Sequence, residues 1–183
     1  MMDDPQLESV IRQLGGSVVD SVDICNVLIT QSVKRTLKLL TAVGQGKPIC
    51  STKWVETSKK ENQFVDAWDY ILIDKEAERK WNFSLRTSLE RSLQEKLFEG
   101  YTFQLLVTTA LDVLKGAIES CGGKTVTKTL KGVNKFVVVS SPDNKEKYKK
   151  LLKQQPNLMI VEPEAIFDGV LRQEIRFEKH LLK

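Results

Sequence analysis

The order of predicted helices and strands repeats along the 183-residue chain, and this repeat limits the possible folds more than any other feature. Gly15-Gly16 and Gly122-Gly123 each end a predicted helix, because glycine accepts the positive φ that a helix C-cap requires. The two pairs are 107 residues apart, and Ile49 and Ile160, which precede the last helix of each unit, are 111 residues apart. The sequence therefore predicts two copies of one small α/β module.

Two apolar runs, at 26–30 and 136–139, lack the polar alternation of a half-exposed strand. Such runs are typical of strands buried on both faces of a parallel sheet. Further short strands are predicted at 17–19, 47–50, 101–107, 125–126 and 158–161. Each module is thus expected to be a small parallel sheet flanked by helices. We assign 1–66 to the first module, 67–96 to a linker with a helix over 84–93, and 97–183 to the second module.

The two predicted modules differ at their beginnings. The second has a strand, Tyr101 to Val107, before its first helix, whereas the first begins directly with a helix from Pro5. We expect either that the first strand of the first module lies upstream of Met1 or that this module departs from the pattern.

The helix that follows the first buried strand has more apolar surface than one small sheet needs. Its residues Leu37, Leu40 and Val43 recur at helical spacing. We therefore expect the two modules to pack head to tail as one rigid unit, through this helix and the helices at 110–121 and 163–171.

Composition and residue spacing argue against several functional classes. No apolar run approaches the ~18 residues of a membrane helix, so we expect no membrane association. The three cysteines form no Cys-x-x-Cys pair, no metal-ligand spacing is present, and His180 is the only histidine. No carboxylate pair stands out. We predict no catalytic residues, no metal and no cofactor.

A basic turn at the start of the Leu37 helix is the strongest functional signal. Arg35 and Lys38 are three residues apart in the expected first turn, where cations lie unfavourably beside the positive end of the helix dipole. Two such cations together with free N–H groups can hold an anion. The alternative is that the turn is only a solvated basic surface.

The chain resembles tandem BRCT domains. The resemblance rests on the two glycine pairs, on Trp54 in the last helix of the first module and on Arg35-Thr36-Leu37-Lys38. Further motifs are similar to the C-terminal BRCT pair of the mediator of DNA damage checkpoint and PAX-interacting protein families: Tyr70-Ile71-Leu72, Asn82-Phe83-Ser84-Leu85, Leu97-Phe98-Glu99-Gly100-Tyr101 and Gly169-Val170-Leu171-Arg172-Gln173.

The resemblance implies a site for a phosphoserine peptide across the cleft between the repeats. It assigns phosphate binding to Lys38, together with a Ser/Thr-Gly pair that would fall at or before Met1. It assigns the pocket for the residue three beyond the phosphoserine to Arg35, Leu40, Thr108, Thr109 and Phe167. Arg35 could instead pair with an acidic residue of the second repeat, and Leu40 and Phe167 could instead be core at the repeat interface.

By the same resemblance, the chain is expected to act in the nucleus as part of a DNA-damage mediator. Its partners would be a phosphorylated protein tail, such as that of a histone variant at double-strand breaks, and other DNA-damage proteins. One alternative is a scaffold or dimerisation module that binds no phosphate. Another is DNA-end binding by the lysine-rich helix at 144–154, although nucleic acid is not the ligand that we favour.

Overall fold

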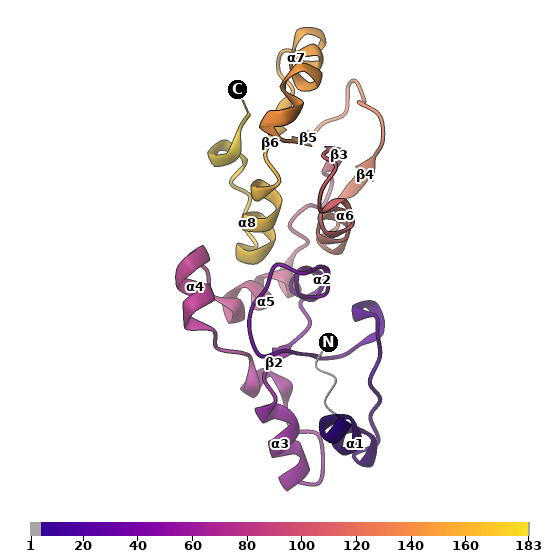
Figure 1. Cartoon of the computed structure of the whole chain (residues 1–183), viewed down its shortest axis with the longest axis vertical. Coiled ribbons are helices and arrows are strands. Elements are labelled where there is room, and N and C mark those ends of the chain that lie inside the picture. Colours follow the sequence, from indigo (N-terminus) through magenta and orange to yellow (C-terminus); the bar gives the residue numbers. More distant parts are fainter. Residues whose placement is uncertain (1–4, 183) are drawn as a thin grey trace.

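The computed structural model describes residues 5–182, which form two lobes stacked along the long axis of the molecule (Figure 1). The helices of the described part are α1 (Pro5–Gln13), α2 (Leu37–Gln45), α3 (Lys53–Lys60), α4 (Lys75–Trp81), α5 (Leu85–Gln94), α6 (Leu111–Ser120), α7 (Lys145–Gln154) and α8 (Glu164–Arg172). Its strands are β1 (Leu28–Ile29), β2 (Ile49–Cys50), β3 (Thr102–Leu106), β4 (Lys124–Val126), β5 (Phe136–Ser140) and β6 (Met159–Val161). Short 3-10 turns lie at Val22–Ile24, Ala67–Tyr70, Pro142–Asn144 and Phe177–His180.

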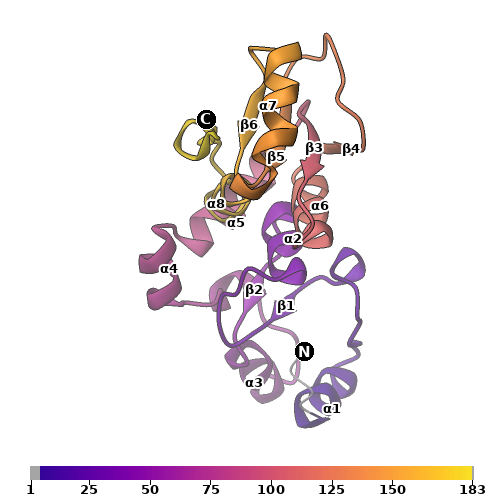
Figure 2. The same ribbon diagram turned by 45° about the horizontal axis from the view of Figure 1, so that its top comes forward.

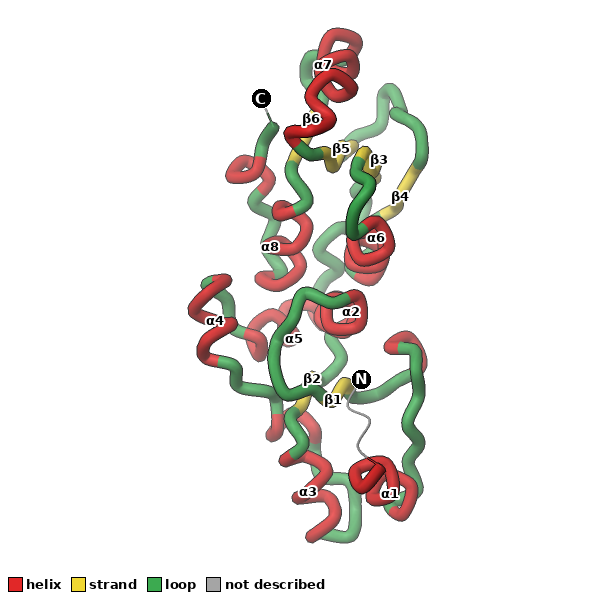
Figure 3. Tube along the Cα trace, viewed as in Figure 1, coloured by secondary structure: helices red, strands yellow, loops and turns green. Residues whose placement is uncertain are grey.

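The second repeat contains a complete parallel sheet in the order β4-β3-β5-β6. All five residues of β5 are buried, as its uninterrupted apolar run predicted. Val138 packs with Tyr148 of α7 on one face, and Val137 and Val139 belong to the main core on the other. The prediction of a small parallel sheet flanked by helices is confirmed (Figure 3).

The sheet of the first repeat has only β1 and β2 in the described residues. The strand predicted at 17–19 is absent, and these residues run as an irregular segment. The N–H groups of Leu28 and Thr30 donate to the carbonyls of Pro48 and Cys50, so the N–H of Ile29 between them points toward the free edge. Both residues of β1 are only half-buried, unlike those of β5. In the described residues, the segment 17–19 pairs with neither β1 nor β2.

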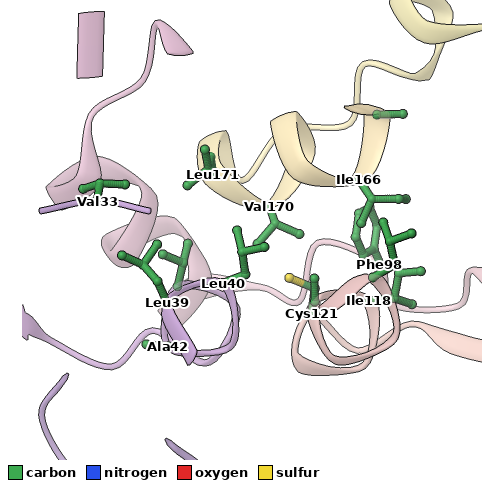
Figure 4. Packing of buried hydrophobic residues seen from close by; sticks show 14 of the residues in the cluster. Val33, Leu39, Leu40, Ala42, Phe98, Ile118, Cys121, Ile166, Val170 and Leu171 are labelled. Atoms are coloured by element: carbon green, nitrogen blue, oxygen red, sulfur yellow. The ribbon is translucent and has the colours of Figure 1, made fainter. Parts of the chain in front are cut away.

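The two repeats share one core, as predicted. Helix α2 of the first repeat packs against α6 and α8 of the second and against α5 of the linker (Figures 1 and 2). Figure 4 shows Leu40 of α2 facing Val170 and Leu171 of α8, with Cys121 at the end of α6 close by. A side chain at Gly44 would approach the Ser120 hydroxyl within 2.4 Å, so only glycine permits this close contact of α2 and α6.

The linker is more ordered than the sequence indicated. Helix α5 occupies 85–94, close to the expected 84–93, and the Ser92 hydroxyl donates a 2.6 Å hydrogen bond to the Val43 carbonyl of α2. Residues 70–73 form the end of a 3-10 turn and one antiparallel bridge between Ile71 and Cys50. Helix α4, which the sequence did not predict, places Trp81 beside the repeat interface.

Helix α2 ends at a glycine cap. The helix ends at Gln45, and Gly46 adopts the left-handed conformation with φ 69°, from which its N–H reaches the carbonyls of Ala42 and Val43.

None of the helices in residues 5–182 is long and apolar enough to cross a membrane.

Candidate functional site

Lys38 lies in the first turn of α2, at the boundary between the repeats. Thr36 caps this helix, and its hydroxyl accepts a 3.4 Å hydrogen bond from the N–H of Leu39. The first turn contains no acidic residue that would balance the positive end of the helix dipole. Lys38 itself is half-buried rather than fully exposed, and it forms no hydrogen bond or ion pair with any residue in the range 5–182.

A second lysine, Lys47, follows the other end of α2. Lys47 donates to the backbone carbonyls of Val22 and Asp23, the latter at 2.8 Å. Burial raises the pKa of the neighbouring Cys25 thiol, and the positive charges of Lys47 and Lys38 partly oppose this rise. The positive charges of Lys47 and Lys38 therefore both act on the surroundings of Cys25.

Arg35 precedes α2, so the prediction that Arg35 and Lys38 both lie in the first turn of the helix is wrong for Arg35. The Thr36 cap requires extended backbone, which directs the chain before it away from the helix. Nη1 and Nη2 of Arg35 each donate a 2.7 Å hydrogen bond to one carboxylate oxygen of Glu164, the first residue of α8. The ion pair with an acidic residue of the second repeat, which the sequence left open, is the arrangement observed.

Two aromatic rings flank the Arg35 guanidinium. Its central carbon lies 4.8 Å from the centroid of the Trp81 ring and 5.8 Å from that of Phe167. A planar guanidinium is well suited to such stacking. Its Nε is buried and has no partner in the described part of the chain. Arg35 is thus held in one position by contacts from both repeats.

The other predicted pocket residues divide into surface and core. Thr108 and Thr109 are exposed on the loop that follows β3, and Phe167 is half-buried on α8. Leu40 is fully buried in the shared core. Its side chain therefore has no surface for a ligand, and the core alternative holds for this residue.

Asp74 holds the segment before α2 in place, and the sequence analysis missed it. One carboxylate oxygen accepts the N–H of Val33 at 2.8 Å and the other accepts the N–H of Ala77 at 3.0 Å, which caps α4. These backbone hydrogen bonds, that of Ala77 first, hold the pKa of Asp74 below its usual range. The only available signal was an aspartate ahead of a short helical stretch, which did not reveal the bond to Val33, 41 residues away.

Replacing Asp74 by alanine should destabilise the fold by about 2 kcal/mol, since it removes a helix cap and leaves the Val33 N–H without its partner. Because the folded-state pKa is lowered, the stabilisation by Asp74 is complete above its unfolded pKa of about 3.9 and is lost as the pH falls through the folded value. Chemical denaturation of wild type and variant from neutral to acidic pH should show the difference shrinking below about pH 4. Asp69→Ala is the matched control, and a constant difference at all pH values would contradict this role.

The side chains characteristic of catalytic and metal sites do not gather at one place in residues 5–182. No group of three or more potential metal ligands occurs among these residues. Burial raises the pKa of the Cys50 thiol to about 12 and that of Cys121 to about 11, so both are poor nucleophiles at neutral pH. His180 lies 3.8 Å from Asp168 of α8.

Two sequence models of BRCT domains match the chain. One, described as BRCT domain, matches residues 96–180. The other, described as the BRCT domain of regulator of Ty1 transposition protein 107, matches residues 3–72.

The similarity to a curated relative extends over nearly the whole chain. Mediator of DNA damage checkpoint protein 1 from Rattus norvegicus is 34% identical over 182 residues, which are 98% of this chain and 14% of the relative. The chain thus spans only a small part of that protein's length.

Solved structures share the fold. The BRCT5-BRCT6 domains of S. pombe Brc1 superpose with a TM-score of 0.74 at 21% identity, over 94% of this chain and 90% of theirs. Rtt107p in complex with a phosphorylated histone gives a TM-score of 0.65 at 15% identity, over 98% of this chain and 86% of that one. The two sequence matches and the two-lobed fold agree, and the chain belongs to the BRCT family as a tandem pair of BRCT domains.

Proposed function

We propose that this BRCT pair is a non-catalytic module that binds a phosphoserine peptide across the boundary between its repeats. The observation that carries the proposal is Lys38, a half-buried cation in the first turn of α2 with no ion-pair partner in the described residues. A phosphoserine dianion offers three strong acceptor oxygens, and lysine together with helix N–H groups suits them. The phosphorylated histone bound by Rtt107p, a structure of the same fold, supports this class of ligand.

We further propose that the peptide runs from Lys38 toward Arg35 and Phe167. Three extended residues span roughly 10 Å, which suits two binding points on neighbouring elements. The exposed Thr108 and Thr109 would contribute to the wall from the second repeat, and Trp81 from the linker would add an aromatic surface beside Arg35. Leu40 would shape the wall only from beneath, since it is fully buried.

The biological setting follows from the relatives as a proposal. The curated relative is a DNA damage checkpoint mediator, which favours a nuclear DNA-damage protein as the parent of this module. A phosphorylated C-terminal tail, such as that of a histone variant at double-strand breaks, is the ligand we propose. Other DNA-damage proteins with phosphorylated tails belong to the same chemical class.

The direct test is a titration with a phosphoserine tail peptide and its unphosphorylated twin, measured by calorimetry. Two charge-assisted hydrogen bonds, each worth at least about 1.5 kcal/mol, should make the phosphopeptide bind about a hundredfold more tightly. Equal affinity for the two peptides would refute phosphate recognition and favour the scaffold alternative.

Arg35 should read a free carboxylate at the end of the ligand. Glu164 uses one N–H of each terminal nitrogen, so the outer N–H groups of the guanidinium can bind a second carboxylate. For a peptide that ends three residues after its phosphoserine, amidation should weaken binding to wild type about fivefold, the scale of a partly exposed ion pair.

The same amidation should have little further effect on Arg35→Ala, which makes the comparison a double-mutant cycle. Arg35→Lys, which keeps the charge but loses the planar fork, should fall between the two. If amidation weakens binding equally in wild type and Arg35→Ala, then Arg35 does not contact the carboxylate. The pocket then recognises the last residue of the peptide by its shape alone.

A further inference from the structure

A second concave site lies on the far side of the second repeat. A cavity of about 280 Å³ opens where β5 and β6 begin, near the lower limit of about 300 Å³ for ligand pockets. Leu130 and Val133, from the loop between β4 and β5, belong to its lining and are 37% and 38% exposed. Pro156 and Leu158, from the connection between α7 and β6, line it as well, and none of its lining side chains is charged.

The chain segments that form this cavity are strongly basic. Its loop and the neighbouring α7 carry nine exposed lysines: Lys124, Lys128, Lys131, Lys135, Lys145, Lys147, Lys149, Lys150 and Lys153. Only Asp143 and Glu146 oppose them in this segment, and they lie at the start of α7 together with Lys145 and Lys147. Within residues 5–182, none of the nine forms an ion pair with a carboxylate. This uncompensated charge attracts anionic partners.

We propose that this pocket binds an acidic peptide segment, which inserts one bulky aliphatic side chain between Leu130 and Val133 while its carboxylates face the lysines. The exposed side chains of Leu130 and Val133 favour an apolar anchor between them, and the lysines of the same segments favour negative charge beside it. Nucleic acid fits less well, since it offers no aliphatic anchor. Base stacking would require an exposed aromatic ring, and Phe136, the aromatic residue of the lining, is only 8% exposed.

The pocket is separate from the proposed phosphopeptide groove. Thr108 and Glu164 follow the carboxyl ends of β3 and β6, whereas the pocket lies at the amino ends of β5 and β6. The five residues of β5 place these two edges of the sheet roughly 13 Å apart. The module can therefore hold both ligands at once.

The test uses the whole chain and two fluorescein-labelled peptides, each a short run of glutamate and aspartate with one central residue. In one peptide the central residue is leucine, and in the other it is serine, so that their charge is identical. Fluorescence anisotropy at low salt should show the leucine peptide binding about tenfold more tightly, the effect of burying one leucine side chain. Equal affinities would overturn the proposal.

Variants locate the contact. Leu130→Ser should reduce the affinity of the leucine peptide to that of the serine peptide, whereas Lys131→Glu should weaken both by several-fold. Ile24→Ser, at a 71% exposed position of the first repeat, and Lys59→Glu are the matched controls and should change neither affinity. Lys38→Ala should also leave binding unchanged, which separates this site from the phosphate site. If Leu130→Ser, shown to be folded by circular dichroism, binds both peptides as wild type does, the proposal is wrong.

A competition experiment decides between peptide and nucleic acid. The leucine peptide should resist displacement by a short DNA duplex better than the serine peptide does, because only the leucine peptide has an apolar anchor. If the duplex displaces both peptides equally and binds Leu130→Ser as tightly as wild type, the lysine surface is a nucleic-acid site, and the proposal is overturned.

Discussion

Replacing Leu40 by alanine is expected to destabilise the chain by about 3 kcal/mol, the usual cost of a leucine-to-alanine change in a packed core. The side chain is fully buried between the helices of both repeats, where the neighbouring elements cannot collapse into the cavity without separating (Figure 4). Thermal unfolding followed by circular dichroism should show the midpoint lowered by about 10 °C for a chain of this size. Both repeats should unfold together, because Leu40 belongs to a core that they share.

Leu37→Ala on the same helix is the control for this experiment. Leu37 is 40% exposed, so its truncation should cost about 1 kcal/mol or less. Two separate transitions in Leu40→Ala, with only the first repeat affected, would contradict a single rigid unit. An equal loss of stability in the two variants would contradict the special position of Leu40.

Replacing Lys38 by alanine is expected to weaken phosphopeptide binding about thirtyfold, or about 2 kcal/mol, the value of one hydrogen bond between charged groups. Stability should change by less than about 0.5 kcal/mol, because Lys38 makes no ion pair or hydrogen bond that its removal would break in the described structure. Calorimetry with the phosphorylated peptide measures the first effect and denaturant unfolding the second.

Two controls make this result specific. Lys34→Ala removes an exposed lysine of the same basic turn and should have a small effect that added salt abolishes. The unphosphorylated peptide should bind wild type and Lys38→Ala equally. Wild-type affinity for the phosphopeptide in Lys38→Ala would exclude Lys38 from the site.

The architecture could be predicted because it depends on local patterns that the sequence contains. The glycine pairs ended helices where expected, and the apolar run at 136–139 became part of a strand that is buried at every residue. The apolar surface of α2 correctly predicted a helical interface between the repeats. A strand requires pairing with a neighbour, however, and the segment predicted as a strand at 17–19 pairs with neither β1 nor β2 in the described residues.

The details of the site depend on contacts between residues distant in sequence, which one sequence does not contain. The pairing of Arg35 with Glu164 joins residues 129 positions apart. The sequence indicated only that Arg35 could pair with some acidic residue of the second repeat. Trp81 was missed because the short helix α4 has little apolar periodicity of its own. Asp74 was missed because its bond to the Val33 N–H follows from how the linker folds back on the first repeat.

Helix α2 is part of the first repeat in sequence, but it is held in place mainly by other parts of the molecule. The helix belongs to the first repeat by its place in the chain, yet its neighbours are mainly α6, α8 and α5. The remainder of the first repeat is held by a two-stranded sheet and a small separate cluster around Trp54. Local opening of that outer part therefore costs less free energy than unfolding of the shared core. When α1 and α3 open locally and exchange their amide hydrogens with solvent, α2 remains packed on the second repeat, and Lys38 keeps its position there.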